Sequence, residues 1–283
     1  MTIERTRQRF ESNVSGAAAP ELSRLGYPVW VRSVRWYCGL ALLSSVSACS
    51  GGGGNHAPQQ PAYGPAPVGP PAAAPPGGPT FARYGRMDRA TCEAELARRA
   101  IPAIRGEETP GVLAPIRLRG PLSGVSIHSG LPAKQRDRSH LEIFDCRLVL
   151  ALDDFAALIA SRGVVEMIHM SSYRPQSENG CTPRHIGEQH CAALAVDVGY
   201  FKRSDGVVLN VEKDFHGRIG QETCGGTAAP NPPSPAANEL WSFLCEATRR
   251  TLFAVILTPN YNAEHRNHFH LEITPGSDWM MIK

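Results

Sequence analysis

The spacing of apolar and polar residues predicts three helices between residue 87 and the C-terminus. Helical spacing occurs over residues 87–101, which Asp88 would cap, over 155–161, which Asp153 or Asp154 would cap, and over 239–251. Gly163 is expected to close the second helix. The third segment is amphipathic, and its apolar side chains fall on one face: Leu240, Phe243, Leu244 and Ala247.

Strand-like segments surround these helices. Residues of high β-propensity occur in short pieces of 111–129 and over 141–152, 164–173, 194–201, 207–211, 253–257 and 268–273. Ser204-Asp205-Gly206 has the composition of a tight turn, which predicts a hairpin between the strands on either side of it. The sequence therefore predicts an α+β fold with a central, mainly antiparallel sheet and helices on one side.

The N-terminal part of the chain has a different composition. Residues 50–80 are mostly Gly, Pro and Ala, which bury too little apolar surface to offset the entropy lost on ordering. We therefore divide the chain into an N-terminal region over 1–48, a flexible linker over 49–81 and one domain over 82–283. About two hundred residues suffice for one domain with a sizeable core.

The charge balance excludes some classes of function. The whole chain has 29 basic and 26 acidic residues, and residues 1–48 contain six of the former and three of the latter. Basic and acidic residues are therefore equal in number downstream. This balance gives no electrostatic argument for binding nucleic acid or for a basic membrane-binding face.

An apolar run over residues 36–48 follows two arginines and fits the core of a signal peptide, because it is too short to span a bilayer comfortably. Its end, Val46-Ser47-Ala48-Cys49, resembles the lipobox of bacterial lipoproteins, which implies cleavage before Cys49 and lipidation of its thiol. We therefore predict an exported protein of the cell envelope or periplasm, anchored by lipid at Cys49. The alternatives are an ordinary secreted protein and a chance apolar segment. The long polar lead is atypical, and the true start could lie near Val29 or Val31.

The cysteines fit an oxidising compartment. Cys38 would be removed with the signal and Cys49 would carry lipid, which leaves an even number in the domain: Cys92, Cys146, Cys181, Cys191, Cys224 and Cys245. Such a set allows about fifteen disulfide connectivities. We favour Cys92–Cys146, Cys181–Cys191 and Cys224–Cys245. A cysteine metal site is the alternative, but the sequence contains no C-x-x-C pair.

Histidines and one aspartate form the candidate site. In a strand, His268 and His270 would share one face, while their apolar neighbours would pack on the other. Asp197 lies in an apolar, β-prone run, where an unpaired carboxylate is costly, and His190 precedes it. Two imidazoles and a carboxylate are the ligand set of an open zinc site. A fully extended chain would separate His190 from Asp197 by about 23 Å, so a shared metal requires the chain to fold back between them.

Several stretches resemble a known family. Gln189-His190 with Ala195-Val196-Asp197 resembles the S-x-H-x-x-G-x-A-x-D motif of the lysostaphin/D-Ala-D-Ala carboxypeptidase/hedgehog-type zinc peptidases, and His268-x-His270 resembles their closing H-x-H. The wider pattern is closest to the bacterial extensin-like C-terminal domain family. The resemblance covers about residues 87–275 and implies a hedgehog/D-Ala-D-Ala-peptidase-like fold. Further stretches that carry it are Val198-Gly199-Tyr200-Phe201, Asp205-Gly206, Cys181, Cys245 and residues 255–260 and 262–271.

The resemblance implies His190, Asp197 and His270 as ligands of Zn²⁺. His268 would be a further imidazole beside the metal, and His265 a candidate proton shuttle, as in the similar H-x-x-H-x-H layout of penicillin-insensitive murein endopeptidases. Arg174, in Ser172-Tyr173-Arg174, resembles the S-x-Y-R segment of D-Ala-D-Ala carboxypeptidases, where the guanidinium faces substrate oxygens. The alternative role for Arg174 is a surface salt bridge.

Three positions depart from the family motif. Glu188 replaces its Ser, Ala193 replaces its Gly, and Asn267 stands where many relatives have an acid. An amide is no general base, so this role moves to His265, Glu264 or Glu188, or catalysis is lost.

Taken together, the resemblance implies a lipid-anchored zinc metallopeptidase that hydrolyses amide bonds in peptidoglycan peptides, with His265, His268 and Arg174 as catalytic residues. The expected partners are peptidoglycan peptides and, through the anchor, a membrane; the chain is expected to be monomeric and not to bind nucleic acid. The rival is a non-catalytic extensin-like wall-binding module that keeps the fold, with or without zinc. A cysteine peptidase using Cys191 is disfavoured, because neighbours on a strand point apart and Cys191 would not face His190. The sequence also lacks the G-x-S-x-G and H-E-x-x-H motifs.

Overall fold

The computed structural model describes residues 78–175, 187 and 189–283, and these lie in the unit Pro67–Lys283. The predicted signal region, nearly all of the predicted linker, Cys181 and Glu188 fall outside the described residues. Within the described ranges, none of the helices combines the length and the apolar character that a membrane span requires.

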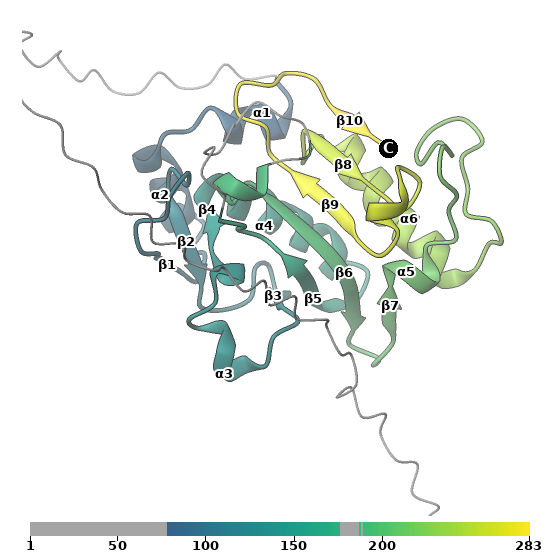
Figure 1. Ribbon diagram of the computed structural model, residues 1–283, viewed down its shortest axis with the longest axis horizontal. Coiled ribbons are helices and arrows are strands. Elements are labelled where there is room, and N and C mark those ends of the chain that lie inside the picture. The colour runs from purple at the N-terminus through teal and green to yellow at the C-terminus, as the bar shows by residue number, and fades with distance from the viewer. Residues whose placement is uncertain (1–77, 176–186, 188) are drawn as a thin grey trace, which may run out of the picture. The chain divides into compact units, whose positions relative to one another are not determined.

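A seven-stranded mixed sheet forms the centre of the domain (Figure 1). Its strands are β3 (Ser126–Ser129), β5 (Val164–Ser171), β6 (Ala195–Arg203), β7 (Val208–Asn210), β8 (Val255–Leu257), β9 (Phe269–Glu272) and β10 (Met281–Ile282). The order is β10-β8-β9-β6-β5-β3, and β7 pairs with β6 beyond the end of β9. The β3–β5 and β8–β10 pairs are parallel and the others antiparallel. The α+β class and the mainly antiparallel sheet are thereby confirmed.

A second, smaller sheet and the helices complete the domain. The small antiparallel sheet contains β1 (Ala103–Arg105), β2 (Pro115–Leu118) and β4 (Phe144–Asp145). The longer helices are α1 (Thr80–Gly85), α2 (Arg89–Arg98), α4 (Cys146–Ala160) and α6 (Pro235–Arg249). The short ones are α3 (Ala133–Arg136), α5 (Val211–Asp214) and the 3₁₀ turns η1 (His140–Glu142), η2 (Gln189–Ala192) and η3 (Ala263–His265). Figure 1 shows α4 and α6 behind the large sheet, on one of its faces.

The core lies between this sheet face and the helices. Phe155 of α4 packs edge-on against Phe201 of β6 and against Phe253, and Phe201 also contacts Phe243 of α6. All four rings are fully buried. Burial of each such side chain contributes roughly 2–3 kcal/mol. The helices thus cover one face of the sheet and leave the other for the candidate site.

Several sequence predictions are confirmed with shifted boundaries. α2 occupies most of the first predicted helix, and Asp88 caps it by accepting a hydrogen bond from Thr91 N at 2.7 Å. The turn before Gly206 joins β6 to β7 as a hairpin. α6 begins four residues earlier than predicted, because Ser234 caps it by accepting from Ala237 N at 3.1 Å.

The prediction of β-structure over 141–152 is confirmed only at Phe144–Asp145, which form β4, and is wrong for the rest of the range. Residues 146–160 form one helix, α4, capped by Asp145, whose carboxylate accepts from Arg147 N at 3.0 Å. Asp153 and Asp154, predicted as caps, lie inside this helix and form ion pairs with Arg99. Because α4 is buried over most of its circumference, its apolar residues run almost continuously and hide the helical period.

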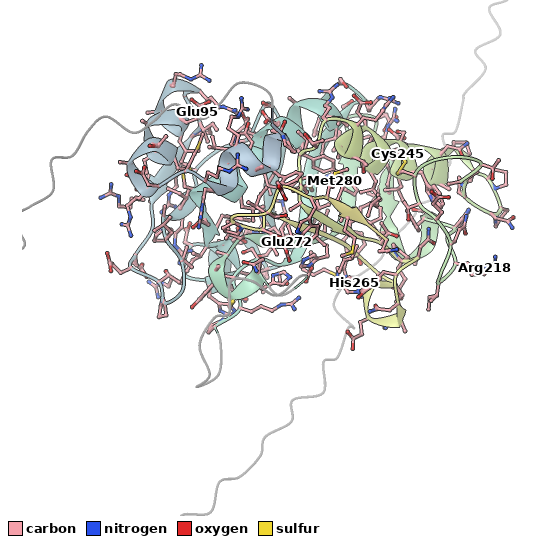
Figure 2. All side chains as sticks on the ribbon, turned by 90° about the horizontal axis from the view of Figure 1, so that it is seen from above. Glu95, Arg218, Cys245, His265, Glu272 and Met280 are labelled. Carbon is pink, nitrogen blue, oxygen red and sulfur yellow. A yellow bond between two sulfur atoms is a disulfide. The ribbon has the colours of Figure 1, made fainter. Side chains whose placement is uncertain are left out.

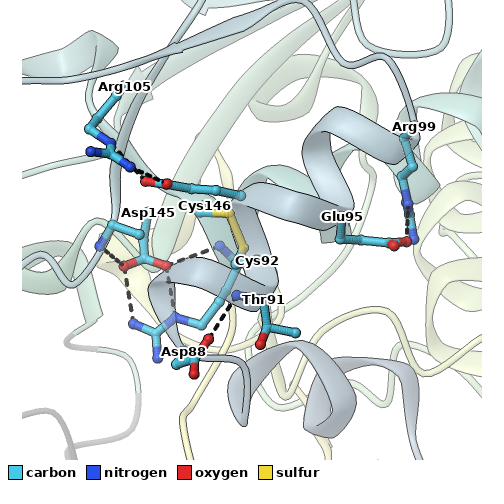
Figure 3. The surroundings of a disulfide bond; sticks show 11 residues. Asp88, Thr91, Cys92, Glu95, Arg99, Arg105, Asp145 and Cys146 are labelled. Atoms are coloured by element: carbon cyan, nitrogen blue, oxygen red, sulfur yellow. Dashed lines mark hydrogen bonds and ion pairs between the residues drawn. A yellow bond between two sulfur atoms is a disulfide. The ribbon is translucent and has the colours of Figure 1, made fainter. Parts of the chain in front are cut away.

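Two of the three favoured disulfides are confirmed. Cys92–Cys146 joins α2 to the first residue of α4, beside the cap residue Asp145 (Figure 3), and Cys224–Cys245 joins a loop to α6. The third favoured pairing involves Cys181, which lies outside the described residues.

Candidate metal centre

Two neighbouring strands place the first two residues of the site. Asp197 of β6 and His270 of β9 are direct partners in the antiparallel β6–β9 ladder. Directly opposed residues have Cβ atoms about 4.5–5.5 Å apart, so their side chains meet on the same face. As predicted, the neighbours Phe269 and Leu271 point into the core on the other face.

His190 reaches the same place by a reversal of the chain. It lies in η2, where Ala193 N donates to His190 O and Leu194 N donates to Gln189 O, at 3.1 and 3.0 Å. Ala193 has a φ of 53°, in the left-handed region that favours glycine. This conformation fits the Gly that the similar zinc-peptidase motif has at the matching position. The turn brings His190 beside Asp197 despite the seven residues of separation.

Three ligand atoms converge at the centre of the site. The Nε2 atom of His190 and the Nδ1 atom of His270 each lie 3.1 Å from Asp197 Oδ1, and the two nitrogens are 3.3 Å apart. All three residues are at least 95 % buried. Among the described residues, this is the one cluster of at least three His, Cys, Asp or Glu side chains with the geometry to hold a metal ion.

Hydrogen bonds on the far side of each imidazole fix its orientation. His190 Nδ1 donates to the Ser172 carbonyl oxygen at 2.6 Å, and His270 Nε2 donates to Glu272 Oε2 at 2.9 Å. The fully buried Glu272 also accepts from Thr274 Oγ1 at 2.7 Å. With these protons engaged, the other nitrogen of each ring faces Asp197 and is the atom available to a metal ion. Histidine ligands of metals are characteristically held by such outer hydrogen bonds.

The second carboxylate oxygen of Asp197 is held separately. Its Oδ2 atom accepts from Ser171 Oγ at 2.8 Å and from Arg174 Nη2. Arg174 also donates to Ser171 Oγ, and its side chain is 56 % exposed. Arg174 therefore lies at the open side of the site and contacts Asp197, a candidate metal ligand. It is not part of an isolated surface ion pair.

The two other predicted histidines lie beside the three candidate ligands. His268 Nε2 is 3.4 Å from Asp197 Oδ1, and its Nδ1 donates to Asn267 Oδ1 at 2.8 Å. His265 lies against His268, with ring centroids 4.9 Å apart, and its Nδ1 donates to Asn262 Oδ1 at 2.7 Å. Asn267, the departure from the family pattern, thus orients His268.

The electrostatics of the metal-free site divide the imidazoles into two kinds. Burial opposes charge on His270, but hydrogen bonds to Asp197 and Glu272 outweigh it and raise the pKa of His270 to about 9. Burial also opposes the Asp197 charge, yet His190 and His270 hold the Asp197 pKa well below its usual range. Burial and the neighbouring His268 and His270 lower the pKa of His265 to about 4. Burial likewise lowers the pKa of His268. His265 and His268 are therefore neutral at pH 7.

The site lies on the side of the sheet away from the helices, as the positions of His265 and of Cys245 on α6 show (Figure 2). Two half-exposed apolar side chains border it. Met170 is 43 % exposed beside Gly199, where a Cβ would lie 3.4 Å from the Met170 side chain and 3.6 Å from Asn267 O. Tyr261 is 42 % exposed and packs edge-on against His265. The polar centre is therefore bordered by two apolar side chains, Met170 and Tyr261.

Sequence reasoning missed three residues that shape the site. Ser171 and Ser172 hold Asp197 and His190, and Glu272 holds His270. Glu272 carried a usable signal: it lies two residues after His270, on the same face of a predicted strand. In the S-x-Y-R segment that ends at Arg174, the Ser is Ser171, so this segment could have indicated Ser171.

An α+β domain with a buried His-Asp-His cluster on the uncovered face of its sheet defines a candidate metalloprotein. The sequence model described as "Extensin-like protein C-terminus" matches residues 89–282. Because this match covers more than half of the chain, the protein belongs to the extensin-like C-terminal family. A comparison with curated proteins gave no match. A comparison with solved structures gave none either.

Proposed function

We propose that this protein is a zinc-dependent peptidase of the cell envelope that hydrolyses amide bonds in peptidoglycan peptides. The observation that carries the proposal is the convergence of His190 Nε2, His270 Nδ1 and Asp197 Oδ1 within 3.3 Å of one another. Three protein ligands with an open side are the arrangement of catalytic zinc sites, whereas structural zinc sites are closed by four.

The spacing and the chemistry of the three atoms both fit zinc. A tetrahedral ion with bonds of about 2.0–2.1 Å separates its ligand atoms by roughly 3.3–3.4 Å, close to the observed 3.1–3.3 Å. Two imidazole nitrogens favour zinc over calcium or magnesium, which prefer oxygen ligands. A cation would also offset the cost of burying the Asp197 carboxylate.

The chain's own residues would divide the work at this site. His190, His270 and Asp197 would hold the ion, which when bound lowers the pKa of water and polarises a carbonyl oxygen. His265, neutral at pH 7, would accept a proton at Nε2, because its Nδ1 is engaged by Asn262. Arg174 borders the same centre and would donate hydrogen bonds to the oxyanion of the substrate. His268 is neutral and its Nδ1 donates to Asn267, so its Nε2 would donate to the oxyanion only after taking up a proton.

The cellular setting is part of the proposal. The Cys92–Cys146 and Cys224–Cys245 disulfides support an oxidising compartment. The lipobox-like Val46-Ser47-Ala48-Cys49 supports export and a lipid anchor. A monomer tethered in the cell envelope would meet peptidoglycan peptides as its most abundant amide substrates.

Turnover of purified muropeptides by the zinc-loaded full-length chain tests the proposal. We expect cleavage by the wild type, and we expect Asp197→Asn to abolish it. His140→Gln is the matched control, because His140 is exposed and its side chain forms no hydrogen bond or ion pair within the described part of the chain. A folded, zinc-replete wild type that cleaves none of the muropeptides would contradict the peptidase and favour a wall-binding module.

A further inference from the structure

A second pocket lies away from the candidate metal centre, between the small sheet and the free edge of the large one. Its volume is about 290 Å³, and its walls come from β2, β3, α3 and η1. Three arginines line it: Arg117, Arg119 and Arg136. The carboxylates in the wall are Asp137 and Glu142, so cationic groups outnumber anionic ones.

Arg117 is the unusual group in this pocket. It is only 8 % exposed, yet among the described residues it forms no ion pair. Its guanidinium uses one donor, Nη1, on the Ser139 carbonyl oxygen at 2.9 Å. A guanidinium carries five N–H donors, and a buried charge is costly without a partner. The remaining donors of Arg117 therefore favour an anion in the pocket that it lines.

The carboxylates near Arg117 are engaged elsewhere. Glu142 Oε1 accepts from Ser129 N and from Ser129 Oγ, at 2.9 and 2.5 Å. Asp137 pairs with Arg119 at 3.2 Å, with both side chains well exposed. Arg136 donates from Nε to the Leu131 carbonyl oxygen and forms no ion pair with any described residue. Two guanidinium groups in this pocket thus lack an anionic partner.

The pocket also offers a backbone edge. β3 ends the order of the large sheet and pairs only with β5 within the described part of the chain. Ser129 N donates to Glu142 Oε1 and Ser129 O accepts from His128 Nδ1, so the part of this edge left for a ligand is residues 126–128, which line the pocket. An unpaired strand edge presents backbone N–H and C=O groups to which an extended peptide can bind. This edge favours a peptide over a free inorganic anion.

One short segment connects this pocket to the candidate metal centre. Glu142 in the pocket wall belongs to η1, and the flanking Leu141 and Ile143 carbonyl oxygens accept from Ser172 Oγ at 2.5 and 2.9 Å. The Ser172 carbonyl oxygen in turn accepts from His190 Nδ1. A molecule bound in the pocket would therefore lie beside the segment 141–143, which holds Ser172, the residue that orients His190.

We propose that the pocket at Arg117 and Arg136 binds a carboxylate of the peptide substrate, with the adjoining peptide laid along the β3 edge. The identity of the ligand as a peptide rests on the proposed function, whereas the anion site rests on the two arginines. A pocket of this volume is at the small end of ligand sites and fits one carboxylate-bearing residue and its neighbour.

Calorimetric titration of the zinc-free, full-length protein tests this inference, because chelation removes carboxylate binding to a metal. The probes are N-acetyl-Ala-Ala with a free carboxylate, the same peptide as its amide, and inorganic phosphate. We expect the acid to bind about tenfold or more tightly than the amide, because charge-assisted hydrogen bonds to guanidinium are lost in the amide. Arg117→Gln should remove this preference, and Arg136→Gln, which alters a half-buried residue, should reduce it.

His270→Ala separates this inference from the proposed function, because it removes a candidate metal ligand and should leave the acid preference unchanged. Equal binding of acid and amide, or a preference that survives in folded Arg117→Gln and Arg136→Gln, would overturn the carboxylate site. Binding of phosphate that the acid peptide does not displace would overturn the peptide assignment. Loss of muropeptide cleavage with the acid preference intact would defeat only the peptidase.

Discussion

His270 and Glu272 project from the same face of β9, and His270 Nε2 donates to Glu272 Oε2 at 2.9 Å. This hydrogen bond turns the Nδ1 atom of His270 toward Asp197. We predict that Glu272→Gln lowers zinc affinity about 10- to 100-fold, because the amide holds the ring less firmly and makes it less basic. Competition with a chromogenic chelator measures the affinity. Glu222→Gln, at an exposed carboxylate, is the control, and equal affinities in the two variants would show that Glu272 does not support the ligand.

Ala193 and Ala195 provide a matched test of the turn that brings His190 to Asp197. Both are fully buried, but only Ala193 has a positive φ, of 53°. Replacement by glycine removes a methyl group at either position, and only at Ala193 does it relieve left-handed strain of about 1–2 kcal/mol. We therefore predict that Ala193→Gly is more stable than Ala195→Gly by about that amount in urea unfolding. Equal stabilities of Ala193→Gly and Ala195→Gly would show that backbone strain at position 193 does not account for the glycine in the similar motif.

Arg174 separates catalysis from metal binding. Its Nη2 donates to Asp197 Oδ2, and its side chain remains half-exposed toward the open side of the site. We predict that Arg174→Gln retains zinc and lowers kcat/KM for a muropeptide about 10²- to 10³-fold, as loss of an oxyanion donor does. Arg162→Gln, at an exposed position, is the control. Unchanged turnover in Arg174→Gln would show that Arg174 only forms an ion pair with Asp197 and does not contribute to catalysis.

His169 predicts how stability depends on pH. It is fully buried against Phe144 and has no hydrogen-bond partner for either ring nitrogen among the described residues. Burial lowers its pKa to about 3, so between pH 6.5 and 3 the unfolded chain binds a proton that the folded protein does not. The stability linked to His169 is therefore complete above pH 6.5 and falls by about 1.4 kcal/mol per pH unit below it.

The His169→Phe variant isolates this contribution. From pH 6.5 to pH 5, the wild type should lose about 2 kcal/mol more unfolding free energy than the variant, as measured by urea unfolding. Parallel losses in the two proteins would show that His169 becomes protonated without unfolding.

The sequence alone predicted the strands that carry the site. It did not predict the turn and the hydrogen bonds that hold the site residues in place. Alternation in β9 correctly placed His268 and His270 on one face and Phe269 in the core, because strand periodicity is local. The prediction that His190 belongs to the site depended on the family resemblance. The turn that positions it has a left-handed residue at Ala193, and an alanine in the sequence does not indicate that conformation. Ser172 acts through its backbone carbonyl, which any residue provides, so its side chain could not reveal that role.

The helix α4 shows the other limit of sequence reasoning. Its apolar residues pack against several elements, so burial on most sides removed the amphipathic period that identified α6. Asp145 was the true cap, but Asp153 and Asp154 offered the same chemistry and are instead used by Arg99. Only the tertiary position of Arg99 distinguishes these aspartates.

The zinc content of the full-length protein tests the central claim most directly. After loading with zinc and exhaustive dialysis, elemental analysis should find close to one zinc ion per chain in the wild type and in the His140→Gln control. His270→Ala and Asp197→Asn, each checked for folding by circular dichroism, should have lost it. His270→Ala removes one of three ligand atoms that lie within 3.3 Å of one another, and Asp197→Asn replaces the anionic ligand by a neutral amide. A folded wild type without zinc, or full zinc in both variants, would contradict the assignment of His190, Asp197 and His270 as a zinc centre.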